Sequence, residues 1–97
     1  GMSSTSLNVS NIRTINEPSN LDVEVLTSVI NNVQLFGPEE EIAELSAENV
    51  LVQVDCQNLT STAGQGQQTL PVTIQIPSSS RIFAVGSYTV ECQITAQ

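Results

Sequence analysis

In two distant segments of this sequence every second residue is apolar, and this alternation limits the fold more than any other feature. The segments run from Val50 to Cys56 and from Tyr88 to Ala96. Successive side chains of a β-strand point to opposite faces, so a period of two predicts strands with one buried face. The side chains expected to point inward are Val50, Val52, Val54 and Cys56, followed by Tyr88, Val90, Cys92, Ile94 and Ala96.

Shorter apolar or alternating segments indicate further strands over most of the remaining sequence. We expect strands at Leu21–Val25, Val33–Phe36, Leu70–Ile76 and Arg81–Val85, and an irregular extended segment at Leu7–Ile15. Clusters of Asn, Ser, Gly and Pro mark turns or loops at residues 17–20, 31–32, 58–68 and 77–80. Strands at this spacing predict a mostly β domain, a small antiparallel sandwich or barrel-like fold of about six or seven strands.

One short helix is expected after Gly37–Pro38. Proline suits the first helical position, because its missing N–H group has no partner there. Glu39–Glu41 would then lie in the first turn, where carboxylates favour the positive end of the helix. Ile42 and Leu45 are three residues apart and share a face, and the helix is expected to end near Ala47.

The length of 97 residues fits a single domain. We expect residues 1–6 to be a loosely held polar tail, with Gly1 as the remnant of a cleaved tag, and residues 7–97 to form the domain. The sequence has no signal segment and no apolar run approaching the ~18 residues of a membrane helix. Because Gly1 is not a natural start, we expect this chain to be a piece of a longer protein.

The charge balance excludes some classes of partner. Two arginines, Arg13 and Arg81, face ten carboxylates, and the formal net charge is -8. Binding to nucleic acid depends on Lys and Arg contacts with phosphates, so we expect no nucleic-acid partner. Anionic lipid head groups are disfavoured for the same reason, and direct membrane insertion by this segment is not expected.

The chain lacks the usual groups for catalysis. There is no His and no Lys, so the Ser and Thr hydroxyls have no ordinary activating base. Asp22 with Glu24, or Asp55 with Glu91, would provide a carboxylate pair if they met across strands. We favour the alternative that these are solvated charges on outer faces. The prediction is a non-enzymatic protein with no catalytic residue and no cofactor.

Two groups of residues offer potential metal ligands. Glu39–Glu41 offer the oxygen ligands that calcium prefers, but side chains in one helical turn diverge, so we favour the role at the helix end. Cys56 and Cys92 are too few for a metal site without histidine. They are expected to be buried apolar residues, with a disulfide as the alternative if their strands adjoin in an oxidising compartment.

Three polar features leave alternatives open. Asn8-Val9-Ser10 and Asn58-Leu59-Thr60 match the acceptor triplet for glycosylation, a match that also arises by chance in a chain rich in Asn, Ser and Thr. For Arg13 and Arg81 we expect surface ion pairs. The alternative for Arg81, which lies close to Phe83, is contact with a partner.

Several segments, in order, resemble YbbR-like domains. Val33–Pro38 is similar to the family's strand that ends in Gly-Pro and opens a short helix. Val50–Leu59, with Val54-Asp55 before Asn58-Leu59, resembles its V-D-L-S-G-L segment, although Cys56-Gln57 replaces Leu-Ser. Leu70–Val72 and Tyr88–Ile94 resemble the strands that follow. The resemblance extends from about Ile12 to Ala96.

This resemblance implies a small, mostly β fold with a swapped-hairpin arrangement, similar to the C-terminal domain of L25-type ribosomal proteins. It implies tandem repeats behind an N-terminal membrane helix in bacteria, mainly Gram-positive ones, with the repeats outside the cytoplasmic membrane. The parent protein would regulate a membrane diadenylate cyclase, the enzyme that makes cyclic di-AMP. Partners would be that cyclase and sibling repeats, and the family supplies no catalytic residue.

Two functions follow from these observations. The first is a regulatory interaction module in a membrane-anchored protein that controls cyclic di-AMP synthesis. The second is a passive spacer repeat in a cell-surface or adhesive protein. An exposed hydrophobic edge strand would favour contacts by strand addition, but periodicity alone does not identify the edge strands.

Overall fold

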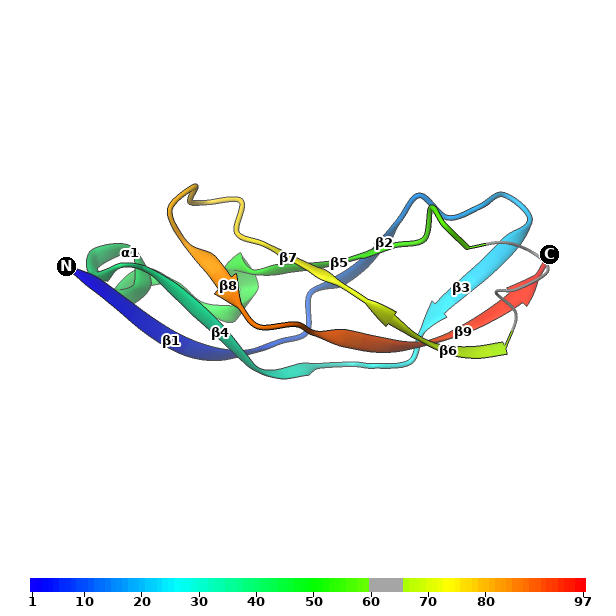
Figure 1. The fold of residues 1–97 in the computed structure, drawn as a ribbon, viewed down its shortest axis with the longest axis horizontal. Coiled ribbons are helices and arrows are strands. Elements are labelled where there is room, and N and C mark those ends of the chain that lie inside the picture. Colours follow the sequence, from blue (N-terminus) through cyan, green and yellow to red (C-terminus); the bar gives the residue numbers. More distant parts are fainter. Residues whose placement is uncertain (60–65) are drawn as a thin grey trace.

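The computed structural model describes residues 1–59 and 66–97, in which nine strands form three sheets beside one short helix and one 3₁₀ turn. Figure 1 shows the chain as a long, narrow body. The elements are β1 (Met2–Val9), β2 (Ile12–Ile15), β3 (Leu21–Val25), β4 (Ile30–Pro38), α1 (Glu39–Glu44), η1 (Ala47–Asn49), β5 (Leu51–Asp55), β6 (Gly66–Pro71), β7 (Thr73–Gln75), β8 (Phe83–Val85) and β9 (Thr89–Ala96).

The three sheets are small and open, and the described strands do not close into a barrel. Their strand orders are β1-β4-β8, β2-β5-β7 and β3-β9-β6. Neighbours are antiparallel except β2 and β5, which run parallel. The mostly β class with one short helix is therefore confirmed, whereas the barrel-like alternative and the count of six or seven strands are wrong.

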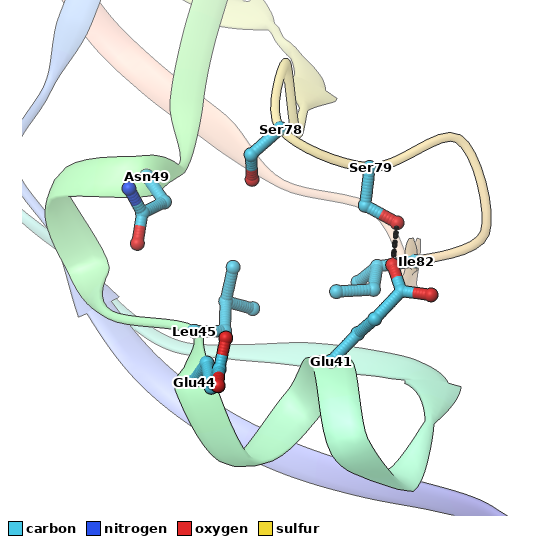
Figure 2. Close-up of a pocket in the computed structure, with 7 residues that line it drawn as sticks. All are labelled: Glu41, Glu44, Leu45, Asn49, Ser78, Ser79 and Ile82. Carbon is cyan, nitrogen blue, oxygen red and sulfur yellow. Dashed lines mark hydrogen bonds between the residues drawn. The ribbon is translucent and has the colours of Figure 1, made fainter.

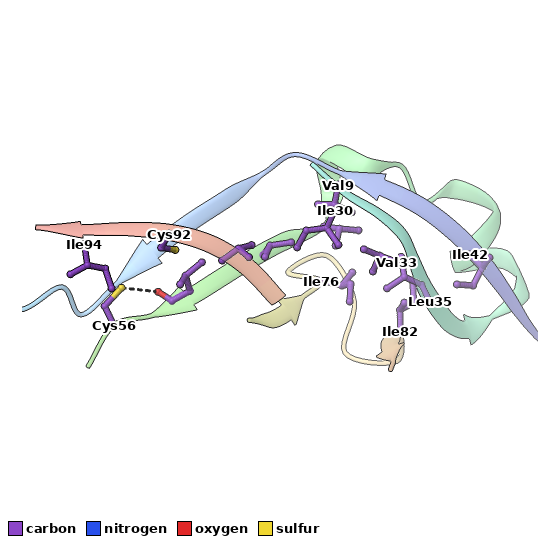
Figure 3. Close-up of a cluster of buried hydrophobic side chains, with 14 of the residues drawn as sticks. Val9, Ile30, Val33, Leu35, Ile42, Cys56, Ile76, Ile82, Cys92 and Ile94 are labelled. Atoms are coloured by element: carbon purple, nitrogen blue, oxygen red, sulfur yellow. Dashed lines mark hydrogen bonds between the residues drawn. The ribbon is translucent and has the colours of Figure 1, made fainter. Parts of the chain in front are cut away.

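The molecule is elongated, with extents of 49 × 21 × 19 Å. Its radius of gyration is 15.0 Å, against about 12.5 Å for a compact domain of this length. The two termini lie at opposite ends of the long axis (Figure 1). The core is correspondingly a row of apolar side chains along the body, from Ile94 to Ile42 (Figure 3).

The alternating segments supply much of this core, as predicted. The fully buried side chains that they contribute are Val50, Val52, Val54, Cys56, Val90, Cys92 and Ile94. Tyr88 is half-buried, as is the row Leu70, Val72 and Ile74 that leads to buried Ile76. Ala96 is exposed, against prediction; it lies at the end of β9, where Leu21 is its pairing partner among the described residues.

The N-terminal residues are ordered, which corrects the prediction of a loose tail. Met2–Ser6 form most of β1, and each pairs with a residue of β4, from Pro38 back to Gln34. Strand pairing uses backbone groups, which polar residues supply as well as apolar ones. The prediction relied on side-chain polarity, and that property does not report the pairing.

Asn31–Asn32 is not a break between segments but part of β4, where the strand bulges. Leu7 pairs with Val33 and Val9 with Ile30, so two β4 residues face Asn8 alone. Asn32 has a φ of 59°, and its N–H donates to Asn8 Oδ1 over 3.0 Å. The side chain of Asn8 thus satisfies a backbone group that the bulge removes from the ladder.

Helix α1 is shorter than predicted. Pro38 precedes it with a φ of -58° and a ψ of 138°, so the proline ends β4 and is not the first helical residue. The backbone N–H of Glu39 donates to Gly1 O over 2.9 Å, which continues the pairing of β1 with β4. Glu39–Glu41 do fill the first turn, as predicted, but the helix ends at Glu44 because Leu45 is extended.

Two predicted single segments are each divided between sheets. Leu7–Ile15 contributes to β1 and β2, and Leu70–Ile76 contributes to β6, which pairs with β9, and β7, which pairs with β5. The polar loop predicted at Asn58–Gln68 is partly wrong, because β6 already begins at Gly66. Residues 60–65 of that loop lie outside the described residues.

Candidate functional site

The most distinctive surface of the described chain is a groove between two edge strands, β7 and β8. Each strand lies at the end of its sheet. The groove between them has a volume of about 400 Å³ and is lined by apolar side chains together with polar ones from Thr73, Gln75 and Ser79. The apolar ones include Val72, Ile74, Ile76, Ile82, Phe83 and Tyr88. Edge strands of this kind present backbone groups that have no strand partner.

Two large apolar side chains of β8 are exposed beside this groove. Phe83 is 53% exposed and Val85 is 51% exposed, whereas Ala84 between them is half-buried. The ring of Phe83 contacts that of Phe36 on β4, with centroids 5.6 Å apart and planes tilted by 58°. These two side chains do not contribute to the buried core. We therefore take β8 and the groove as the candidate interaction surface.

Gly37 allows β8 to approach β4 so closely. A Cβ atom at this position would lie 2.8 Å from Ile82 Cγ1 and 3.1 Å from the backbone oxygen of Arg81. No side chain fits that space without displacement of the backbone that leads into β8. The Gly-Pro pair that the sequence signalled as the end of a strand therefore also shapes the site.

The hydroxyl of Tyr88 fixes the other end of β8. It donates to Val85 O over 2.6 Å and accepts from the N–H of Gln34 over 2.9 Å. It thus bridges the paired residues Gln34 and Val85. The intervening Gly86 has a φ of +101°, a conformation that favours glycine, and this turn brings the tyrosine back over the strand.

An acidic hollow of about 260 Å³ continues the groove towards α1 (Figure 2). It shares Ser79 and Ile82 with the groove and adds Glu41 and Glu44 from the helix. A third hollow of about 200 Å³ shares Val72 and Thr73 and includes Asp55. Both hollows that adjoin the groove therefore contain carboxylates.

Glu41 is the most engaged of these carboxylates. It accepts a hydrogen bond from Ser79 Oγ, as Figure 2 shows, and pairs with the guanidinium of Arg81. The bond from Ser79 and the charge of Arg81 lower the pKa of the Glu41 carboxyl below its ordinary value of 4.5. The ion pair predicted for Arg81 is confirmed. Glu40 lies further away, with 3.9 Å between its Oε1 and Arg81 Nη2.

The other polar features flagged in the sequence are dispersed. Asp22 and Glu24 share the outer face of β3, where Asp22 accepts a hydrogen bond from Gln97. Asp55 and Glu91 belong to different sheets, so they do not meet across paired strands. Within residues 1–59 and 66–97, no cluster of three or more potential metal ligands is present, and Glu39–Glu41 do not converge on one point.

Cys56 and Cys92 are fully buried and free, so the alternative of a disulfide is wrong for this structure. Cys56 directly follows β5 and Cys92 lies within β9, and these two strands belong to different sheets. Burial, aided by the charge of Glu17, raises the pKa of the Cys56 thiol to about 11, and burial also raises the pKa of Cys92. Neither thiol has the lowered pKa and exposure of a reactive cysteine.

The remaining features flagged in the sequence are the two acceptor triplets and Arg13. Asn8 is the bulge partner of Asn32, as described above. Thr60, the third residue of the second acceptor triplet, lies outside the described residues. Arg13 makes no ion pair with a described acidic residue, against prediction, and its Nε donates to Asn11 Oδ1 over 3.4 Å.

The sequence did not identify the groove in advance. Phe83 and Val85 are visible as alternating apolar residues, and Arg81 beside them was considered for partner contact. Whether β8 lies inside a sheet or at its edge depends on pairing with distant residues. The bridging role of Tyr88 and the close approach at Gly37 have no local signal either.

The fold and the surface together define a small, elongated β module with an apolar groove between two edge strands. Neither protein-family models nor curated protein sequences give a significant match to this chain. Among solved structures, the chain is similar to the crystal structure of the YbbR-like domain of a Listeria monocytogenes protein. The TM-score is 0.64 at 17% identity, over 98% of this chain and 95% of that one.

The chain therefore has the fold of a YbbR-like domain. This confirms the fold expected from the three groups of segments between about Ile12 and Ala96. In the described part of the chain, the one α-helix has six residues, far fewer than a membrane-spanning helix needs.

Proposed function

We propose that this chain is a non-enzymatic interaction module of a larger, membrane-anchored protein, on the outer side of the cytoplasmic membrane. In finer terms, we propose that the larger protein regulates a membrane diadenylate cyclase. The observation that carries the interaction role is the exposed apolar edge of β8 beside its groove, on the fold of a YbbR-like domain. The proposed partners are that cyclase and sibling domains.

The polar chemistry of the described residues supports a role in binding rather than catalysis. None of the described residues that line the groove is acidic or basic. The carboxylate that is most perturbed, Glu41, is already engaged with Ser79 and Arg81. Both thiols are buried with raised pKa values. Such groups are poor candidates for a general base or a nucleophile.

A specific observation favours a second function, that of a passive spacer. The body is 49 Å long, and the chain enters at one end and leaves at the other (Figure 1). Domains joined end to end in this way reach far from a surface for the number of residues that they contain. The spacer function requires length only, whereas the interaction function requires the side chains at the groove.

Two changes to the complete protein, a deletion and a domain replacement, distinguish these functions. In cells that contain the cyclase, residues 2–97 are either deleted or replaced by an unrelated β domain of similar length. Cyclic di-AMP is then measured at matched amounts of membrane-associated protein. The interaction role predicts a changed nucleotide level both after the deletion and after the replacement. A change on deletion that the unrelated domain reverses would favour the spacer, and no change in either case would contradict the regulatory proposal.

A further inference from the structure

We propose that the free edge of β1 pairs with β1 of a second copy of this chain, which would join two three-stranded sheets into one sheet of six strands. Strand β1 lies at one end of the sheet β1-β4-β8, with β4 between it and β8. The inference goes beyond the interaction role proposed above, because it concerns a different edge of the molecule and does not depend on the cyclase.

One side of β1 presents backbone groups that pair with no other strand of the described chain. The N–H of Glu39 donates to Gly1 O over 2.9 Å, at the start of the ladder between β1 and β4. Alternate residues of an antiparallel strand direct their backbone groups to opposite sides, so this bond assigns Ser3, Thr5 and Leu7 to the β4 side. The residues of β1 that point away from β4 are Met2, Ser4 and Ser6.

These three residues of β1 are open to an added strand. Helix α1 and η1 also lie against β1, yet among the described residues no backbone hydrogen bond joins either element to Met2, Ser4 or Ser6. All three residues are exposed. Because buried backbone groups are nearly always paired, the N–H and C=O groups of these residues face solvent.

The other edges of the three sheets carry features that hinder strand addition. Strands β7 and β8 have three residues each, and β2 has four, with Arg13 among them. On β3 the N–H of Val23 donates to Glu17 Oε1 over 3.3 Å, and β6 ends at Pro71, which has no N–H group. Short strands, charges and proline are the usual means by which proteins protect sheet edges. Strand β1 has eight residues without a charge or a proline, and its register with β4 is unbroken until the bulge near its end.

The outward-pointing residues of β1 are arranged symmetrically about Ser4. In an antiparallel pair with a two-fold axis at this position, the two Ser4 residues face each other and Met2 faces Ser6 of the other copy. Each facing pair would exchange two backbone hydrogen bonds, about six bonds in total. Ser3 and Thr5, which are half-buried, would face each other across the new ladder and lose further exposed surface. A two-fold dimer of this kind is the commonest symmetric assembly.

Charge and order favour a second copy over a flexible segment of another protein. The chain has a net charge of -8, but none of its ten carboxylates belongs to β1, so two copies would meet where neither strand carries a charge. In the second copy β1 is already extended and held by β4, so the pairing orders no further chain. Pairing of about five residues buries less area than a standard interface of about 1,600 Å², so we expect a weak dimer, with a dissociation constant of about 10 µM to 1 mM.

The test measures self-association of the 97-residue chain. Sedimentation equilibrium from about 10 µM to about 1 mM should show the average mass rising from one chain towards two. The rise should be steeper at high salt, because salt screens the repulsion between two acidic copies. NMR of mixed labelled and unlabelled chains locates the contact. We expect proton contacts between Ser3 of one copy and Thr5 of the other, with shifts of the outward-pointing β1 amides.

Two variants with the same change of charge test whether the dimer forms at β1. Ser4→Lys places two ammonium groups opposite each other across the two-fold axis, where like charges destabilise a strand pair. Ser28→Lys is the control, because Ser28 is exposed between β3 and β4 and lies outside β1. Both variants reduce the general repulsion between copies equally. Thermal unfolding shows whether each still folds. Should Ser4→Lys fail to fold, Ser4→Pro removes the outward N–H without loss of a bond to β4.

We expect Ser4→Lys to weaken dimerisation at least about tenfold, and Ser28→Lys to leave it unchanged or slightly stronger. Equal dimerisation of the two variants would overturn the proposal. Amide shifts confined to surfaces other than β1 would do the same, since the dimer would then form elsewhere.

A peptide distinguishes a second copy from another occupant of the same edge. The probe is an uncharged peptide of alternating Thr and Val, added to the chain and followed by the amides of β1. A chain that stays monomeric at about 1 mM overturns the proposal. If the peptide shifts the β1 amides of that monomeric chain, the edge binds a segment of another protein instead.

Discussion

The hydroxyl group of Tyr88 stands between two strands where a backbone hydrogen bond would ordinarily lie. It accepts from Gln34 N and donates to Val85 O, so one side chain links β4, β8 and the start of β9. Tyr88 is the first inward-pointing residue of the alternating segment Tyr88–Ala96. The alternation predicts burial of its ring but not the hydrogen bonds of its hydroxyl. Its aromatic ring is half-buried, and the oxygen is the part that fixes β8.

We expect Tyr88→Phe to lower the free energy of unfolding by about 1–2 kcal/mol, because two hydrogen bonds are lost while the ring is kept. Chemical denaturation measures this change. Ser87→Ala is the control, since it removes an exposed hydroxyl from the same turn. Unchanged stability in Tyr88→Phe would mean that the bridge contributes nothing and that β8 is held in another way.

Gly37 is the second residue on which the position of β8 depends. A Cβ at this site would meet Ile82 Cγ1 at 2.8 Å and Ile82 Cα at 3.1 Å. Since backbone as well as side-chain atoms are in the way, we expect Gly37→Ala to destabilise the fold by about 1–3 kcal/mol. Denaturation in urea is the measurement, with Ala84→Gly as a check on ordinary glycine effects in the same sheet. A neutral Gly37→Ala would show that the approach is looser than described.

At the scale of elements, the bulge in β4 shows how a polar pair is accommodated within a strand. Asn32 adopts a left-handed conformation, and its N–H is satisfied by the side chain of Asn8. Asparagine tolerates this conformation better than other residues with a Cβ, and glycine adopts it freely. The bulge allows β4 to keep Ile30 and Val33 buried on either side of Asn31–Asn32.

Substitutions at Asn32 test this account of the bulge. We expect Asn32→Ala to destabilise the fold by about 1 kcal/mol, because alanine lacks the tolerance for positive φ. Asn32→Gly should differ little from the original chain, since glycine accepts the same dihedral angles. Thermal or chemical unfolding of both variants gives the comparison. The reverse order of stabilities would show that side-chain contacts of Asn32, not its backbone, support the bulge.

The elements also show what the sequence can and cannot predict. Burial along Val50–Cys56 and Thr89–Ile94 follows from the period of two, because one side of each strand must leave water. The same period carries no record of which strand lies alongside. For that reason the polar β1, the division at Val72 and the parallel pairing of β2 with β5 were not foreseen.

The candidate site was hidden for the same reason. Phe83 and Val85 read as one more short strand, and periodicity would place such apolar residues in a core. The structure instead places β8 at the end of its sheet, with β4 as its strand partner, and so leaves both side chains exposed. An edge is a property of the assembled sheet, and its residues are identified only when the pairing is known.

At the scale of the whole molecule, an ion pair joins two elements that are distant in this acidic sequence. Helix α1 and the loop that leads into β8 are joined where Glu41 contacts Ser79 and Arg81. These contacts favour the ionised carboxylate, so the pKa of Glu41 is lower in the folded chain than its ordinary 4.5. The carboxylate therefore stabilises the fold when ionised, and this contribution depends on pH.

The dependence has a definite sign. Above pH 4.5 the carboxyl group is ionised in both states, and its full contribution is present. As the pH falls below that value, the unfolded chain takes up the proton first, and the contribution is lost through the lowered folded pKa. We expect the stability difference between the original chain and Glu41→Gln to be largest near neutral pH and to shrink towards pH 3.

Urea denaturation at several pH values measures this difference. Glu44→Gln is the control, because it removes a charge from the same helix outside the contacts with Ser79 and Arg81. Other carboxylates change the overall stability of every variant with pH, so only differences between variants are compared. A difference for Glu41→Gln that stays constant down to pH 3 would mean that the carboxylate does not stabilise the fold through its charge.

The central claim is that the domain acts through the surface of β8, and one cellular measurement tests it directly. Cyclic di-AMP is measured in cells with the cyclase and the complete protein, which carries either Phe83→Ser with Val85→Ser or the control pair Leu26→Ser with Val29→Ser. With equal amounts of folded protein in the membrane, we predict that the β8 variant changes the nucleotide level and the control does not. Equal levels in both strains, matching the original, would contradict the claim.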